Sequence, residues 1–182
     1  MKHLYRSVLL ISCFAATSAS AQTAEQTVAY ILHGLEAGAN SPSLVNDPGS
    51  KVHWEQVSDR PLLLLGKERF VEMKVHIEDL GNCVFRDAFS FSGVGQDSVS
   101  AGSIVTIDLR NASGLASTGV GGTVQKVEVQ GAAYQCSPDP SYTDMSMCEK
   151  TGPDRTWFFG NIDRAKKALT YLQKEFCKSG AF

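Results

Sequence analysis

Cysteine is the residue type in this chain with the widest chemistry, because a thiol can bind metal, attack as a nucleophile or form a disulfide. The chain has five cysteines: Cys13, Cys83, Cys136, Cys148 and Cys177. No C-x-x-C pair occurs, and His33, His53 and His76 do not stand at metal-ligand spacing from the cysteines. We therefore expect neither a metal site nor a bound cofactor.

The first 21 residues have the three parts of a secretory signal peptide. Lys2 and Arg6 give a positive start, residues 8–16 (VLLISCFAA) are apolar, and Ala19-Ser20-Ala21 is an A-x-A cleavage motif. The apolar stretch is shorter than the roughly 20 residues that a membrane-spanning helix needs. We predict a signal peptide over 1–21, no transmembrane anchor, and a mature chain over 22–182 that is periplasmic or secreted.

Cleavage would remove Cys13 and leave four cysteines in an oxidising compartment, which favours two disulfides. Four cysteines allow three pairings. Cys136 and Cys148 flank a segment with two prolines and several turn residues (CSPDPSYTDMSMC), so we predict that they pair. Cys83 would then pair with Cys177 and close a loop of about 95 residues. In the chain-entropy model this loop raises the free energy of the unfolded state by more than 4 kcal/mol, on the order of the largest disulfide effects.

Length and net charge limit the number of domains and the classes of partner. Residues 22–182 have the length of one domain. Loss of Lys2 and Arg6, with no acidic residue lost, takes the net charge from −2 to −4, and the longest basic cluster is Lys166-Lys167. Nucleic-acid binding normally requires a basic patch, so we expect no nucleic-acid partner.

No catalytic motif is visible in the sequence, and we assign no catalytic residue. A G-x-S-x-G nucleophile elbow is absent, and the glycine-rich stretch 114–122 lacks the lysine and hydroxyl residue of a phosphate-binding loop. Arg155 and Trp157, within Asp154-Arg155-Thr156-Trp157, are weak candidates for a binding patch, because arginine and tryptophan are enriched at interface hot spots. The alternative is a turn salt bridge beside a core tryptophan.

The order of elements predicts an α+β fold, with an antiparallel β-sheet or small barrel between an N-terminal helix and a C-terminal amphipathic helix. A capping box from Thr23 to Gln26 begins a helix over about 24–37. Asn161 caps the last helix, in which Ile162, Leu169 and Phe176 share one face. Strands are predicted at 51–57, 62–65, 71–77, 83–91, 104–109, 124–134 and 157–159, with long Gly/Ser-rich loops at 92–103 and 111–122.

A run of antiparallel strands followed by one amphipathic helix (NIDRAKKALTYLQKEFC) resembles the pleckstrin-homology-like barrel over residues 50–178. The closing helix of that family often has the form R-x-x-x-A-hydrophobic-x-x-L, which Arg164, Ala168, Leu169 and Leu172 match. The four cysteines and the N-terminal helix depart from the typical cytosolic domain. The resemblance implies a scaffold for binding and carries over no substrate.

These observations predict an exported, non-enzymatic binding or interaction protein of the bacterial cell envelope, with a protein partner or a small ligand. Two alternatives remain open. One is a secreted effector, inhibitor or immunity-type protein directed at a host or a competing cell. The other is a hydrolase whose catalytic residues are dispersed in the sequence.

Overall fold

The computed structural model describes residues 22–42, 51–68, 71–93, 100–119, 125–142, 145–146, 148 and 156–177. Over these residues the chain forms an N-terminal helix, a C-terminal helix and two sheets of mostly antiparallel strands. The predicted α+β class is confirmed. The predicted signal peptide lies outside the described residues. No described helix has both the length and the apolar character needed to cross a membrane.

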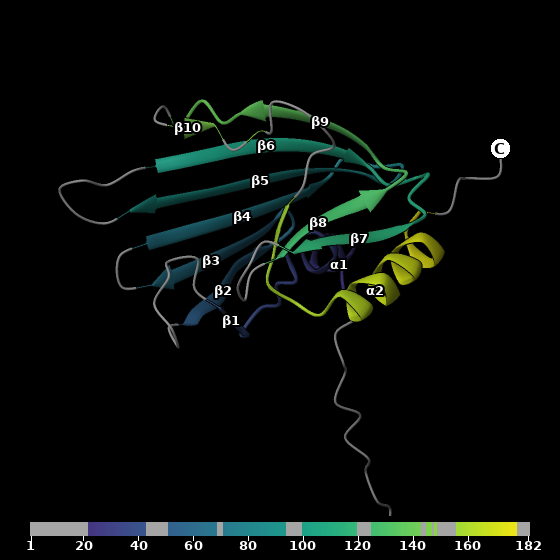
Figure 1. Ribbon diagram of the computed structural model, residues 1–182, viewed down its shortest axis with the longest axis horizontal. Coiled ribbons are helices and arrows are strands. Elements are labelled where there is room, and N and C mark those ends of the chain that lie inside the picture. The colour runs from purple at the N-terminus through teal and green to yellow at the C-terminus, as the bar shows by residue number, and fades with distance from the viewer. Residues whose placement is uncertain are drawn as a thin grey trace, which may run out of the picture.

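The larger sheet is a meander that is extended at one edge (Figure 1). Its strands, in spatial order, are β1 (Asn40–Pro42), β2 (Lys51–Asp59), β3 (Leu62–Glu68), β4 (Val71–Asp79), β5 (Val84–Gly93) and β6 (Ser100–Asp108). The other edge of β6 pairs with β9 (Ala133–Pro138) and with the short parallel strand β10 (Met145–Ser146). The smaller sheet has the order β11 (Thr156–Phe158), β8 (Gln125–Gln130) and β7 (Gly114–Gly119).

Alternation of apolar and polar residues decides which face of each strand is buried. In β2 the side chains of Val52 and Trp54 are fully buried, and in β4 Met73, Val75 and Ile77 are fully buried. The intervening residues face outward. The predicted hairpin is confirmed, because β4 and β5 pair in register around a turn that contains Gly81.

Helix α1 (Ala24–His33) lies at the centre of the molecule, where it contacts β4, both β8 and β11 of the smaller sheet, and helix α2. Every residue of α1 except Gln26 is buried. The helix ends four residues earlier than predicted, because Gly34 has a φ of 68° and terminates it in the left-handed conformation. A side chain at Gly34 would also collide with the backbone of Gly160, so glycine permits a close approach there.

Helix α2 (Ile162–Glu175) begins at the predicted cap, since the Asn161 side chain accepts a hydrogen bond from the Arg164 amide. Ala165, Leu169 and Leu172 form its buried face. Phe176 lies beyond the end of the helix and is 39% exposed, so the apolar face is one position shorter than predicted. In Figure 1 the helix lies beside β7, which it contacts.

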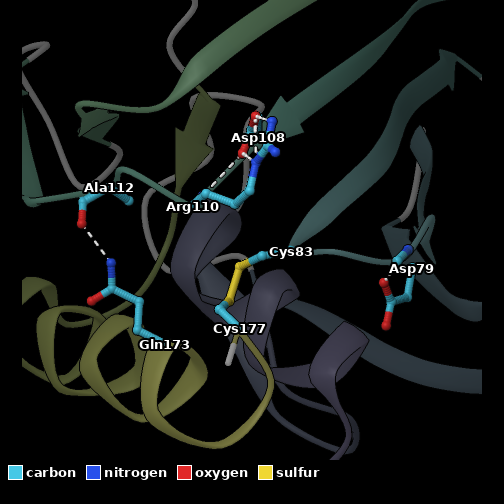
Figure 2. The surroundings of a disulfide bond; sticks show 8 residues. Asp79, Cys83, Asp108, Arg110, Ala112, Gln173 and Cys177 are labelled. Carbon is cyan, nitrogen blue, oxygen red and sulfur yellow. Dashed lines mark hydrogen bonds and ion pairs between the residues drawn. A yellow bond between two sulfur atoms is a disulfide. The ribbon is translucent and has the colours of Figure 1, made fainter. Parts of the chain in front are cut away.

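Two disulfides connect the cysteines in the predicted pairs. The long-range disulfide, Cys83–Cys177, joins the turn before β5 to the end of α2, with Cα atoms 4.9 Å apart (Figure 2). Beside it, the Gln173 side chain donates a hydrogen bond to the Ala112 carbonyl. The short-range disulfide, Cys136–Cys148, begins in β9 and spans Cα atoms 5.7 Å apart. Helix α2 is therefore tied covalently to the larger sheet.

The structure corrects three of the predicted boundaries. Residues 114–119, predicted as loop, form β7, because Leu115 is buried opposite Val129 of β8 and this pairing outweighs the low strand propensity of Gly, Ala and Ser. The strand predicted over 124–134 is two strands that enter different sheets, divided at Gly131, whose φ is 78°. Strand β6 begins at Ser100, inside the predicted loop 92–103.

The element order implied by the pleckstrin-homology-like resemblance is present, with antiparallel strands followed by a C-terminal helix. The sheets do not close into a barrel, because among the described strands neither sheet joins its own edges. Helix α1 instead packs on β4 of the larger sheet and contacts β8 and β11 of the smaller sheet.

Candidate functional site

A surface pocket of about 200 Å³ lies between the first half of α1, the segment that follows α1, and strands β2 and β3. We call it the α1–β3 pocket. Aliphatic side chains form the apolar part of its described lining: Ala29, Leu35, Ala37, Leu62 and Leu64. The polar residues of the described lining are Gln22, Gln26, Gln56 and Glu36. The pocket thus combines an aliphatic floor with three side-chain amides.

The capping box of α1 sets the orientation of the amides. Gln26 accepts a hydrogen bond from the Thr23 amide through Oε1, at 3.0 Å, and its Nε2 donates to Gln56 Oε1 at 3.2 Å. Gln56 in turn donates to Asp59. The same residues that begin the helix therefore hold the amides of Gln26 and Gln56 against each other, where both can offer donors and acceptors to a ligand.

Among the described lining residues, Glu36 is the one with a charged side chain, and Arg164 of α2 compensates its charge. Arg164 donates to both carboxylate oxygens of Glu36, at 3.0 Å for Oε2, and its guanidinium lies 4.6 Å from the centroid of the Tyr30 ring. Desolvation lowers the pKa of Arg164, but the hydrogen bonds and charge interactions with Glu36 and Tyr30 together outweigh it, and the pKa lies above its ordinary value. The described lining of the pocket therefore presents no uncompensated charge.

A second polar group lies in the interior. His33 Nε2 is 2.9 Å from Asp87 Oδ2, and the two side chains are 2% and 1% exposed. His33 Nδ1 is 3.1 Å from the Trp157 carbonyl oxygen, and the imidazole stacks on Phe89 with ring centroids 5.2 Å apart. These contacts connect the end of α1 to β5 of the larger sheet and to β11 of the smaller sheet.

The partners of His33 determine how many protons the pair holds. A carbonyl can only accept a hydrogen bond, so Nδ1 carries a proton. The contact at Nε2 needs one more proton, either on an imidazolium that faces a carboxylate or on the Asp87 carboxyl facing a neutral imidazole. Both arrangements are neutral overall, which lowers the cost of burying the pair.

Ser103 faces the same interior, opposite Phe89 in the β5–β6 register, and is buried. Because His33 stacks on Phe89 and contacts Asp87, a buried serine, histidine and aspartate all lie around Phe89, which raises the question of a catalytic triad. In a triad one imidazole nitrogen contacts the nucleophile and the other contacts the carboxylate. Here the two nitrogens of His33 are occupied by Asp87 and by the Trp157 carbonyl, so these residues do not have the triad arrangement.

The described residues contain no group of three or more His, Cys, Asp and Glu side chains placed to hold a metal ion. His53 is exposed and lies 3.1 Å, through Nδ1, from Asn40 Oδ1. His76 is on the outer face of β4, opposite Leu63 and Ala88 in register. The three histidines beyond the predicted signal peptide therefore have separate surroundings.

The weak binding patch predicted at Arg155 and Trp157 stays a prediction. Trp157 is half-buried in β11, packs against the core, and has the Lys126 ammonium 5.3 Å from its ring centroid. Arg155 lies outside the described residues. The structure brings Trp157 to His33 through a main-chain contact instead.

Sequence reasoning assigned no role to Gln56 or Asp87. One signal for Asp87 was available, because alternation in the CVFRDAFSF segment places it on the same face as Phe85 and Phe89. No such signal exists for Gln56, whose role depends on a contact with α1.

No protein-family model, curated protein or solved structure matches this chain.

Proposed function

We propose that this chain is an exported, non-enzymatic binding protein of the bacterial cell envelope that takes its ligand in the α1–β3 pocket. The observation that carries the proposal is the aliphatic floor beneath oriented amides, with the charge of Glu36 compensated by Arg164. Binding sites commonly combine an apolar lining with a few fixed polar groups. The signal-like N-terminus and the two disulfides support an oxidising compartment outside the cytoplasm.

The lining indicates the chemistry of the ligand. An aliphatic group would displace water from the floor formed by Leu35, Leu62 and Leu64. Amides next to that group would pair with Gln26 and Gln56, since side-chain amides both donate and accept. A charged ligand would be desolvated without a free counter-charge, which is unfavourable. The ligand class is therefore an uncharged aliphatic group that bears peptide-like amides.

The test is a titration of the mature chain, residues 22–182, with N-acetyl-leucinamide as the probe. We expect the side-chain amide NMR signals of Gln26 and Gln56 to shift saturably. Ala37 is exposed at the pocket, so an Ala37→Trp substitution should fill the pocket without disturbing the core. Ala133→Trp, at an exposed position of β9, is the matched control.

Loss of the titration in Ala37→Trp and its retention in Ala133→Trp would support the proposal. Shifts that survive Ala37→Trp, or equal binding of negatively charged N-acetyl-leucine, would contradict the assignment of an uncharged ligand to this pocket.

A further inference from the structure

Gln22 has two properties that no other residue of the chain combines. It follows the A-x-A motif directly, so cleavage there makes it the first residue of the mature chain, and it lines the α1–β3 pocket. Its side chain is exposed and makes no hydrogen bond or ion pair within the described part of the chain. The side-chain amide of Gln22 is therefore free to react with a new α-amino group.

We infer that Gln22 is a modification site, and that export converts it into pyroglutamate. This inference rests on the export that the proposed function includes. The unprotonated α-amine attacks Cδ of its own side-chain amide, and a carbon–nitrogen bond forms to give a five-membered lactam. The bond between Cδ and the amide nitrogen breaks, and that nitrogen leaves as ammonia with a proton from the amine. The step needs no oxidant or reductant.

The capping box tolerates this change because it uses the next residue. The Thr23 amide donates to Gln26 Oε1 at 3.0 Å, and Thr23 Oγ1 accepts from the Gln26 amide at 3.1 Å. The peptide bond between Gln22 and Thr23 is unchanged by cyclisation, so both hydrogen bonds persist. The lactam would be attached to a residue that the helix already fixes.

Charge favours the lactam over the free amine. An α-ammonium at Gln22 would lie just before the first turn of α1, where the helix dipole and the unpaired amides are already positive. Cyclisation removes that charge. It leaves an uncharged amide beside Gln26 and Gln56, so the described lining of the pocket, including the new N-terminus, becomes free of uncompensated charge.

The test uses the full chain, exported from its own precursor by a bacterial host and purified without reduction. Intact mass and N-terminal sequencing are measured on fresh material. We expect the mass of residues 22–182 with two disulfides, less one ammonia, and an N-terminus that is blocked to Edman degradation. A Gln22→Ala variant, which cannot cyclise, should show its own calculated mass with two disulfides and no loss of ammonia, and should give the N-terminal sequence Ala-Thr-Ala.

Each other result overturns the inference in a distinguishable way. A chain that begins at Gln22 and retains its ammonia would refute the modification while leaving export intact; Glu25 of the first turn would then be a candidate partner for the free ammonium. Ammonia loss that develops only during storage would refute a product of export. A chain that keeps residues 1–21, or is cut elsewhere, would refute the predicted processing as well.

Discussion

The first prediction concerns how much the buried pair of His33 and Asp87 contributes to the free energy of unfolding. Replacing His33 by leucine leaves Asp87 Oδ2 without its partner, and Oδ1 already has no hydrogen-bond partner among the described residues. Breaking a buried, hydrogen-bonded charge pair from one side costs about 3–5 kcal/mol. Since domains of this kind are stable by about 5–15 kcal/mol, we expect His33→Leu to lose a large part of the folding free energy.

Asp87→Asn should cost much less, for a reason that follows from the proton count. In the variant the asparagine amide can donate to an unprotonated Nε2, while Nδ1 continues to donate to the Trp157 carbonyl. Only the charge-assisted part of one hydrogen bond is lost, and a neutral hydrogen bond is worth about 0.5–1.5 kcal/mol. We therefore expect a loss below about 1.5 kcal/mol.

A third variant separates loss of contact from the burial of an uncompensated charge. In His33→Leu with Asp87→Val both polar groups are replaced by apolar ones, which is often close to neutral for a buried pair. The double variant should be more stable than His33→Leu alone by at least about 1 kcal/mol, so that the two substitutions are strongly non-additive.

The assay is urea unfolding of residues 22–182 with disulfides intact, followed by the fluorescence of Trp54 and Trp157 and extrapolated linearly to water. Both tryptophans lie near the elements concerned, since Trp54 is in the core and Trp157 contacts His33. Equal losses in His33→Leu and Asp87→Asn, or a double variant no more stable than His33→Leu, would refute the assignment of protons to this pair.

Three further predictions concern the disulfides, two glycines with left-handed φ and one surface ion pair. Changing both cysteines of the long-range disulfide to serine should cost about 2–5 kcal/mol and more than the same change at the short-range disulfide, because its loop is longer, as urea midpoints would show. Gly38→Ala should cost about 1 kcal/mol for its left-handed φ alone, whereas Gly34→Ala should cost about 1–3 kcal/mol more, since it also meets Gly160; equal thermal shifts would contradict this. Hydrogen bonds from Arg110 lower the pKa of Asp108. The pair therefore adds stability above the ordinary pKa of an aspartate, and this stability is lost as the pH falls through the lowered pKa. Asp108→Asn should be slightly destabilising at pH 7, and its stability should equal that of the parent in strong acid.

Local sequence signals predicted the ends and faces of several elements. The Thr23 capping box, the Asn161 cap and the alternation of β4 depend only on neighbouring residues, and all three are present. The pairing of Cys83 with Cys177 could also be inferred, because it is the one pair left among the four cysteines once Cys136 is joined to Cys148.

Features that depend on distant residues were not predictable in this way. Strand β7 forms because β8 is available to pair with it, although its own residues read as a loop. The pocket amides of Gln26 and Gln56 are 30 positions apart. Asp87 could have been noticed as an acid on an apolar strand face, but its partner His33 is 54 positions away and also lies on a helix, where a lone histidine does not indicate a contact.

Helix α1 links the buried pair to the pocket, and this connection gives the stability variants a functional consequence. Its first half supplies Gln26 and Ala29 to the pocket, while its last residue, His33, fixes the helix to β5 and β11. A change at His33 can therefore reach the pocket only by altering the position of α1, about two turns away.

If the pocket is the ligand site, His33→Leu should weaken binding of N-acetyl-leucinamide even where the variant is fully folded, and Asp87→Asn should leave it unchanged. Equal binding by all folded variants would mean that β2, β3 and the capping box hold the pocket without help from the interior pair.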